Sequence, residues 1–392
     1  MTENWFLRAA ACTFFLATAT DTLRPAVSYK ALEFGAGAAE IGVLTASYSA
    51  IAFLVAIPIG HWLDRIGEGY FLIVGAALML ISSRLLSTAA GLYTLGIAFA
   101  GFGAGQILVL IALQVLIANG GNPLRRDLRF SGFAFAGAVG QITGPLLGGF
   151  VTSLAGNETA PAFFVGSLAV LGILVLAISL HIRKPAREYT STVPRASSIL
   201  PSIREVMGAK SMPQATLAGM LTLAGVDVIV AFMPLYGQTN GLSPAQVGVL
   251  LSLRAAASAL SRILMVPLVR TLGRRPTFVL CLALPASALP LVLLRPELFV
   301  LMLLMILSGL GLGLGLPMSL AWMGHAVPSS LRGVAVGVRM AVNSAGQTSL
   351  PVLVGAVGAP LGTGAVFAAY SLLLAAGAIA LAKSDLTTEE VL

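Results

Sequence analysis

Residues 140–149 read GQITGPLLGG, and residues 346–355, which lie 206 positions later, read GQTSLPVLVG. Two glycines and a proline coincide in these segments: Gly140, Pro145 and Gly149 with Gly346, Pro351 and Gly355. The same offset aligns residues of several other types: Asp21 with Asp227, Gly67 with Gly273, Gly103 with Gly309, and Arg126 with Arg332. Chance matching of apolar residues would not align charged residues, glycine and proline without a gap. The chain is therefore predicted to contain two similar halves in parallel repeat.

The composition indicates that lipid, and not water, surrounds most of the chain. Of the 392 residues, 57% are hydrophobic and 10% are charged, and the mean hydropathy is +0.95. A soluble protein carries about 25% charged residues. A membrane-spanning helix needs roughly 20 apolar residues. Several segments of that length or more contain no Asp, Glu, Lys or Arg: 41–63, 85–124, 159–182, 298–331 and 340–382.

Backbone amides inside lipid must be hydrogen-bonded within the protein, so the apolar segments are expected to be helices. Hydropathy predicts the spans 6–30, 39–60, 70–90, 93–118, 131–153, 161–182, 212–235, 244–268, 277–294, 298–322, 333–355 and 361–382. The predicted fold is an all-α membrane protein with twelve transmembrane helices in two six-helix pseudo-symmetric halves. Residues 1–182 form the N-terminal half, 212–392 form the C-terminal half, and 183–211 are predicted to be a cytoplasmic linker.

Basic residues are distributed unevenly between the predicted loops. The loops on the side of the two termini hold most of the Lys and Arg, whereas the opposite loops hold Lys30 and Arg295. The positive-inside rule then places both termini in the cytoplasm. This bias also accounts for the net charge of +8 without a nucleic-acid partner. The two cysteines and three histidines are dispersed, so no disulfide, metal or cofactor is expected.

The loop after the second predicted helix carries a recognisable pattern. Residues 60–69 read GHWLDRIGEG. Through Gly60, Asp64, Arg65 and Gly67 they resemble the loop signature of the major facilitator superfamily, which is a glycine, then Leu-Ala-Asp-Arg, a spacer and Gly-Arg-Arg. The final basic pair of that signature is missing here. The resemblance implies a conformational latch, in which the aspartate interacts with a helix N-terminus of the other half.

The fifth predicted helix resembles the antiporter motif of that superfamily, Gly-xxx-Gly-Pro-xx-Gly-Gly. The matching residues are Gly140, Gly144, Pro145, Gly148 and Gly149. The glycines let a second helix pack closely, and the proline bends the helix. The resemblance is to bacterial drug/proton antiporter-like members and implies a multi-pass exporter of the inner membrane. The arginine that such exporters often carry in their fourth helix has no counterpart in AFAGFG at residues 98–103.

In a parallel six-helix repeat the substrate is expected between the halves near mid-membrane, and rocking of the halves exposes it to each side in turn. Charged residues inside a membrane are costly and are functional candidates. One of two residues, Asp21 or its repeat mate Asp227, is therefore predicted to carry the coupling proton, since a carboxylate in a low-dielectric cavity can be protonated near neutral pH. Asp21 could equally serve to neutralise Arg24, one turn later in the same helix.

Polar residues inside the predicted helices are candidates for lining the substrate cavity: Arg24, Tyr48, Gln106, Arg254, Arg339, Asn343 and Gln347. The last three recur every four residues and so share one helix face. Deep arginines at 254 and 339 favour an anionic substrate, because guanidinium binds carboxylate or phosphate through paired hydrogen bonds. Alternatively, Asp227 balances Arg254 and the substrate is apolar.

These features predict a secondary active transporter and not an enzyme, because the sequence has no P-loop and no recognisable Ser-His-Asp arrangement. The first hypothesis is a proton-coupled exporter of small organic or drug-like molecules. The alternative is a proton-coupled carrier of organic anions such as carboxylates, and a membrane sensor or receptor is a third. The expected partners are a small-molecule substrate, protons and the lipid bilayer, and a monomer is expected to suffice.

Overall fold

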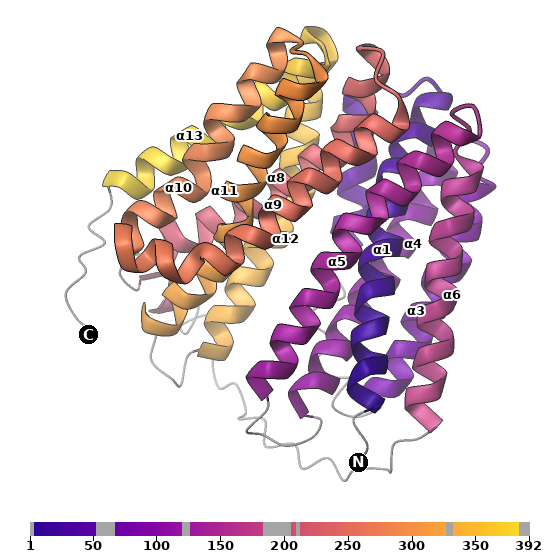
Figure 1. The fold of residues 1–392 in the computed structure, drawn as a ribbon, viewed down its shortest axis with the longest axis horizontal. Helices are drawn as coiled ribbons and strands as arrows, with labels where there is room; N and C mark the ends of the chain where they lie inside the picture. Colours follow the sequence, from indigo (N-terminus) through magenta and orange to yellow (C-terminus); the bar gives the residue numbers. More distant parts are fainter. Residues whose placement is uncertain are drawn as a thin grey trace. The chain divides into compact units, whose positions relative to one another are not determined.

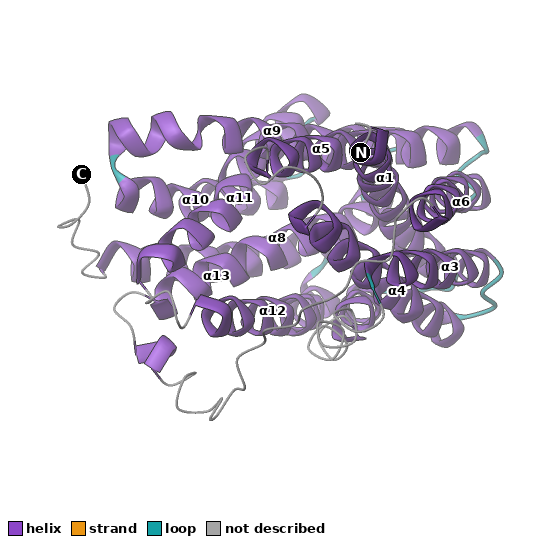
Figure 2. Cartoon of the chain, turned by 90° about the horizontal axis from the view of Figure 1, so that it is seen from below, coloured by secondary structure: helices purple, strands orange, loops and turns teal. Residues whose placement is uncertain are grey.

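The computed structural model describes residues 4–51, 67–119, 126–182, 205–208, 212–326 and 332–383. Within these ranges the regular structure is entirely helical (Figure 2). Nine of the described helices are long and apolar enough to cross a membrane. The prediction of an all-α membrane protein is confirmed. Gly60, Asp64 and Arg65 of the loop signature lie outside the described residues, so the latch stays a prediction.

The chain divides into two compact units, and the first contains the described residues up to Ile182 together with Met233–Ser252. Its long helices are α1 (Asn4–Glu33), α3 (Glu68–Ser87), α4 (Leu92–Asn119), α5 (Arg126–Leu154) and α6 (Ala160–Ile182) (Figure 1). Residues 38–51 are also helical. Helix α1 packs against α4, α5 and α6, and α3 packs against α4 and α6.

The second unit contains the remaining described residues. Its helices are α8 (Met212–Thr239), α9 (Pro244–Leu272), α10 (Arg274–Ala288), the 3-10 helix η2 (Leu289–Leu294), α11 (Leu298–Ala326), α12 (Arg332–Leu361) and α13 (Thr363–Lys383). Helix α10 packs against α11 and α13, and α12 packs against α13 and α11. The end of α8 and the start of α9 belong to the first unit, because residues 233–252 are assigned to it.

Several helices extend beyond their predicted limits. Helix α5 begins at Arg126, five residues before the predicted start. Hydropathy detects only the lipid-embedded part of a helix, whereas the backbone hydrogen bonds continue into the polar boundary. The predicted span 277–294 changes from α-helix to 3-10 helix at Leu289. Pro290 lacks an N–H to continue the α-helical pattern, and short 3-10 segments are common at such ends.

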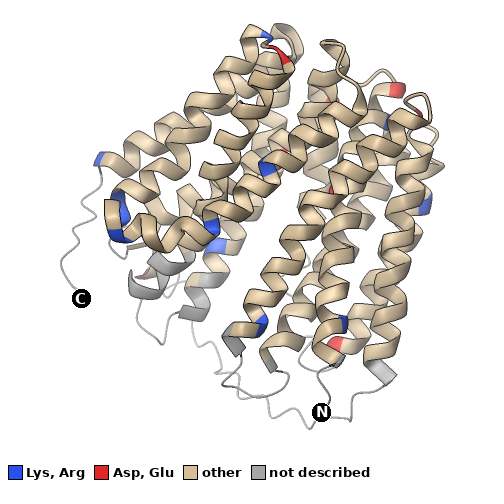
Figure 3. Ribbon diagram, viewed as in Figure 1, with Lys and Arg blue, Asp and Glu red and all other residues tan. Residues whose placement is uncertain are grey.

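The lipid-facing surface is apolar, as the composition requires. Large apolar side chains remain highly exposed within each unit, among them Phe135, Leu154, Ile263 and Leu372. Charged residues are sparse along the described helices (Figure 3). Many large apolar side chains exposed together are typical of a surface that faces lipid hydrocarbon.

The two halves use glycine in the same way at equivalent positions. A side chain at Gly103 of α4 would overlap the carbonyl oxygen of Tyr48. A side chain at Gly309 of α11 would overlap the carbonyl oxygen of Arg254 in α9. Both members of the second pair lie 206 positions after those of the first. Close helix approach is therefore repeated in both halves, as the sequence repeat predicts.

Candidate functional site

The antiporter-like segment of α5 packs directly on α1. A Cβ at Gly140 would lie 2.7 Å from the Cβ of Ala17, and one at Gly144 would lie 2.8 Å from the carbonyl oxygen of Thr18. A Cβ at Gly148 would lie 3.1 Å from Thr22 Cγ2. The three glycines recur every four residues and form one face of α5, as helical spacing requires. Only glycine allows the two helices to come this close.

Asp21 lies on this α1–α5 contact and is buried, with 8% of its surface exposed. A Cβ at Gly144 would lie 3.0 Å from the Asp21 Cβ. Threonines hold the helices together beside it, since the Thr22 hydroxyl donates to the Gly144 carbonyl at 2.9 Å. The Thr18 and Thr143 hydroxyls are 3.3 Å apart. The structure thus brings one predicted proton carrier against the predicted antiporter motif.

Arg24 is buried one turn beyond Asp21, and its guanidinium carbon lies 5.0 Å above the ring centroid of Tyr48. Tyr48 in turn stacks on Phe99 of α4, with ring centroids 4.9 Å apart. A cation over an aromatic face is stabilised by the ring quadrupole. Of the predicted cavity residues in this unit, Arg24 and Tyr48 are therefore brought together, and Gln106 of α4 is half-buried.

A second face of α5 packs antiparallel to the start of α9. A Cβ at Gly149 would lie 3.1 Å from the Gly248 Cα, and one at Gly248 would lie 3.2 Å from the Gly149 Cα. Hydrogen bonds flank this glycine contact on both sides. The Ser252 hydroxyl donates to the Ile142 carbonyl at 2.7 Å, and the Ala245 amide donates to the Ser153 hydroxyl at 2.8 Å. We call these residues, 142–153 with 245–252, the α5–α9 contact.

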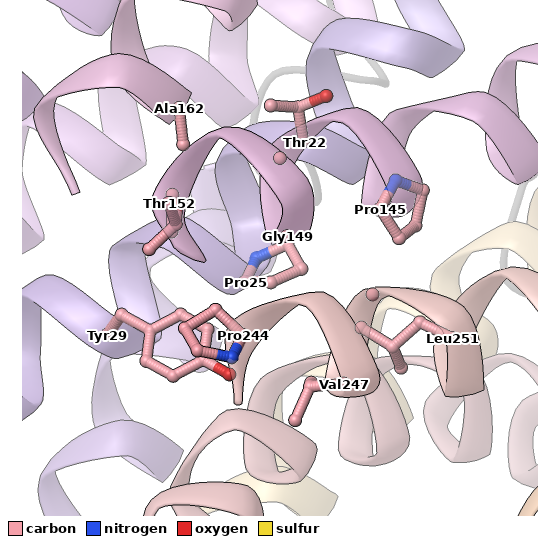
Figure 4. Close-up of a pocket in the computed structure, with 13 residues that line it drawn as sticks. Thr22, Pro25, Tyr29, Pro145, Gly149, Thr152, Ala162, Pro244, Val247 and Leu251 are labelled. Carbon is pink, nitrogen blue, oxygen red and sulfur yellow. The ribbon is translucent and has the colours of Figure 1, made fainter. Parts of the chain in front are cut away.

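A small pocket lies between α1, α5 and the α5–α9 contact (Figure 4). Tyr29, Thr152 and Pro244 are among the residues that line it. Its volume of about 10 Å³ suits one water molecule and is too small for an organic substrate. The Tyr29 hydroxyl is buried and has no hydrogen-bond partner among the described residues. The pocket is therefore too small to be the substrate cavity.

In the second unit the structure connects Asp227 of α8 with Gln347 of α12. The Gln347 side-chain amide donates to the Asp227 carboxylate at 2.8 Å. Asp227 is 3% exposed, so this hydrogen bond is made in a low-dielectric environment. Tyr370 of α13 donates to the carbonyl of Leu221, one and a half turns before Asp227 on α8. The repeat mate of Asp21 is thus bonded to α12, and its helix α8 is bonded to α13.

Arg339 and Asn343 precede Gln347 on the same face of α12, and both are buried. Arg339 Nη1 lies 3.5 Å from the hydroxyl of Ser319 in α11. Arg254 of α9 is also buried, beneath Gly309 of α11. Among the described residues no cluster of His, Cys, Asp and Glu could hold a metal ion.

Comparison with known protein families matches residues 9–239 and 215–390 to the description "Major Facilitator Superfamily". The chain belongs to this superfamily. It is therefore a membrane transporter and not an enzyme, which confirms both predictions. The superfamily match also fits the repeated six-helix halves and the loop and helix signatures found in the sequence.

One curated protein is similar to part of the chain. The chain is 22% identical over 191 residues to "Multidrug resistance protein 1" of Bacillus subtilis (strain 168), which covers 49% of this chain. The alignment spans 45% of that relative, less than half of its length.

Solved transporter structures share the superfamily fold over nearly the whole chain. The nucleoside transporter NupG aligns with a TM-score of 0.77 and 16% identity, covering 97% of this chain and 99% of that one. A POT family transporter in complex with a thioalcohol-conjugated peptide aligns at 0.78 and 14%, covering 96% and 95%. A bacterial homolog of the human lysosomal transporter Spinster aligns at 0.72 and 17%, covering 95% and 93%. At these identities the similarity shows the fold alone.

The sequence did not predict which side chains contact Asp227, Gly149 and Arg339. It placed Gln347 on a polar face but did not predict its bond to Asp227. It did not predict that Gly248 packs on Gly149, or that Ser319 lies beside Arg339. The repeat offset carried one usable signal, since it aligned Gly42-Val43-Leu44 with Gly248-Val249-Leu250 and so marked Gly248 as a repeated small residue.

Proposed function

We propose that this transporter is a proton-coupled antiporter that exports small organic or drug-like molecules, with Asp21 as the proton-binding group. The observation that carries the proposal is the burial of Asp21 against Gly144 of the antiporter-like segment. A carboxylate inside the membrane changes from charged to neutral when it binds a proton, so its solvation cost depends strongly on protonation. Because α1 and α5 pack so closely, a change in the charge of Asp21 would alter the packing of α5.

The α5–α9 contact supports an alternating-access role. It joins residues near the C-terminal end of α5 to residues near the N-terminal end of α9, so these two helix ends are in contact. We propose that these helix ends separate when the substrate site opens to that side of the membrane. The α5–α9 contact would form again when the site closes. Glycine contacts suit such a gate, because they pack closely without interlocking large side chains.

The proposal includes the membrane arrangement and the domain organisation. The excess of Lys and Arg in the loops near the termini supports cytoplasmic N- and C-termini in a bacterial inner membrane. The halves 1–182 and 212–392 would rock about the linker 183–211, as in other parallel-repeat transporters. Transport would then need one chain only. Similarity to a multidrug resistance protein supports a drug-like substrate.

A carrier of small organic anions is the second candidate, favoured by the buried arginines Arg254 and Arg339. The two functions can be separated in proteoliposomes with an imposed pH gradient. We expect a lipophilic cation to move in the direction opposite to the flow of protons down their gradient. We expect Asp21→Asn to abolish this proton-driven movement, whereas counterflow of the cation persists. If the wild type moves only carboxylates, the organic-anion carrier is correct and the drug exporter is not.

A further inference from the structure

We propose that Arg339 and Asn343 of α12, with Ser319 of α11, form a subsite for an organic anion that also carries a hydrogen-bond donor. Arg339 would bind the carboxylate of this molecule, and the Asn343 amide oxygen would accept its donor group. The inference rests on the second candidate function, the organic-anion carrier, because it names the chemistry of the molecule that such a carrier would transport. It does not depend on the direction of transport.

The first step is the charge balance inside the second unit. Helices α8 to α13 contain a single acidic residue, Asp227, whereas Arg254, Arg262 and Arg339 all lie within the spans of α9 and α12. One carboxylate can neutralise one guanidinium. The spans of this unit therefore carry an excess of positive charge, which is costly in a membrane. A negatively charged ligand is one means of compensating it.

Part of this excess positive charge lies at Arg339. Its side chain is 7% exposed, and no carboxylate of the described residues lies within ion-pair distance of it. Its guanidinium lies 3.5 Å from the Ser319 hydroxyl, and its Nε–H is buried without an acceptor in the described part of the chain. The Nε and Nη groups of arginine together form the edge that binds carboxylate through two hydrogen bonds.

The third step adds an unsatisfied acceptor one turn away. The Asn343 Oδ1 is buried and receives no hydrogen bond from the described residues. Gly219 of α8 lies against it, since a Cβ at this glycine would be 3.4 Å from Asn343 Oδ1 and 3.2 Å from Ser319 Oγ. Buried polar atoms are almost always hydrogen-bonded in native proteins, through protein, water or a ligand. An unpaired donor and an unpaired acceptor side by side indicate a polar ligand with both functions.

The spacing of the two residues defines the ligand further. Side chains four residues apart on a helix have Cβ atoms about 5–6 Å apart. A carboxylate and a hydroxyl separated by a similar distance would reach both groups. The molecule 4-hydroxybenzoate has this arrangement on a rigid ring. Benzoate lacks its donor and 4-hydroxybenzamide lacks its charge, so the three probes separate the two parts of the subsite.

The test is equilibrium binding of these three probes to purified protein in nanodiscs, measured by titration calorimetry. In the wild type, 4-hydroxybenzoate should bind about tenfold or more tightly than either of the other probes, because each loses one hydrogen-bonded function. Arg339→Gln should remove the preference over the amide, and Asn343→Leu should remove the preference over benzoate. Arg339→Lys should retain part of the charge preference.

Arg84→Gln is the matched control, since it removes an exposed arginine of α3 from the first unit and should leave both preferences intact. Size-exclusion profiles and thermal unfolding check that each variant is folded, and Ser319→Ala is a milder variant that should weaken anion binding. A wild type that binds none of the probes, or shows no preference among them, overturns the subsite. Variants that lower the Tm but keep both preferences overturn it too, because the groups are then only hydrated packing residues.

The same panel distinguishes failure of the subsite from failure of the proposed function. If the binding preferences hold but neither the probes nor lipophilic cations move under a proton gradient, proton-coupled transport is wrong and the subsite stands. If lipophilic cations move with protons while no anion binds at Arg339, the antiport stands and the subsite is wrong.

Discussion

At the residue scale, the amide of Gln347 holds a buried carboxylate in a defined orientation. It donates to Asp227 at 2.8 Å, and Asp227 is almost fully buried. Hydrogen bonds to charged groups are stronger than neutral ones and are stronger still away from water. The orientation of Asp227 therefore depends on α12 as well as on its own helix α8.

This hydrogen bond gives a stability prediction. Gln347→Leu should reduce the free energy of unfolding by about 1.5–3 kcal/mol, the range for a bond to a charged partner. In an Asp227→Asn background the same substitution should cost less, about 1 kcal/mol, because the bond is then neutral. Unfolding in mixed micelles measures both effects. Ser349→Ala, an exposed position on α12, serves as control. Equal costs in the two backgrounds would show that the bond is absent.

Two glycines of α5 allow a second prediction, because an added methyl group would meet different atoms of α1 at each of them. A Cβ at Gly137 would lie 3.6 Å from Thr13 Cγ2, which is an ordinary contact, whereas one at Gly140 would lie 2.7 Å from the Ala17 Cβ. Gly140→Ala should destabilise the protein by about 1–3 kcal/mol through overpacking. Gly137→Ala should be neutral or stabilising by about 0.5–1 kcal/mol, because alanine favours helix over glycine. Thermal unfolding of the two variants compares them, and equal stability would mean that α1 does not pack on α5 as described.

At the element scale, α5 presents small residues to two different neighbours. Its face 140, 144 and 148 packs on α1, and Gly149 packs on α9. Because successive residues of a helix point about 100° apart, one glycine-rich segment can serve both contacts. Asp21 of α1, the proposed proton-binding residue, and the α5–α9 contact are thus joined through a single helix.

The α5–α9 contact can be tested by cross-linking. In a background without Cys12 and Cys281, Ser153→Cys with Ala245→Cys should form a disulfide under mild oxidation, since the Ser153 hydroxyl lies 2.8 Å from the Ala245 amide. The disulfide should block transport, and a reducing agent should restore it. Each single cysteine variant is the control. Full transport by the cross-linked protein would show that the contact need not open.

The helices themselves were predictable, whereas their partners were not. Lipid forces every span to be long, apolar and helical, so α4, α6 and α13 lie within a few residues of their predicted limits. The polar extension of α5 was missed because it lies outside the hydrophobic signal. Contacts such as Asp227–Gln347 depend on the rotation of two helices about their axes. A single sequence does not specify that rotation, although shared helix faces narrowed the candidates.

At the scale of the whole molecule, the two halves differ in the buried charges that their spans carry inside the membrane. Helix α1 of the first half contains Asp21 and Arg24 three positions apart, whereas the second half has three arginines within its spans for one aspartate. Such a difference suits a carrier in which one half handles the proton and the other the substrate charge. Asp227→Asn should therefore lower the KM for an anionic substrate by about tenfold while proton coupling persists, because it removes the one carboxylate that opposes an anion in these spans. Initial-rate transport measurements check this, and an unchanged KM would contradict it.

The central claim is that Asp21 couples proton movement to export. The most direct measurement records proton flux in proteoliposomes that contain a pH-sensitive dye, after addition of a transported substrate without an imposed gradient. We predict substrate-driven proton movement in the wild type, its loss in Asp21→Asn, and its retention in Asp227→Asn. Proton movement that persists in Asp21→Asn at the wild-type ratio to substrate would contradict the account.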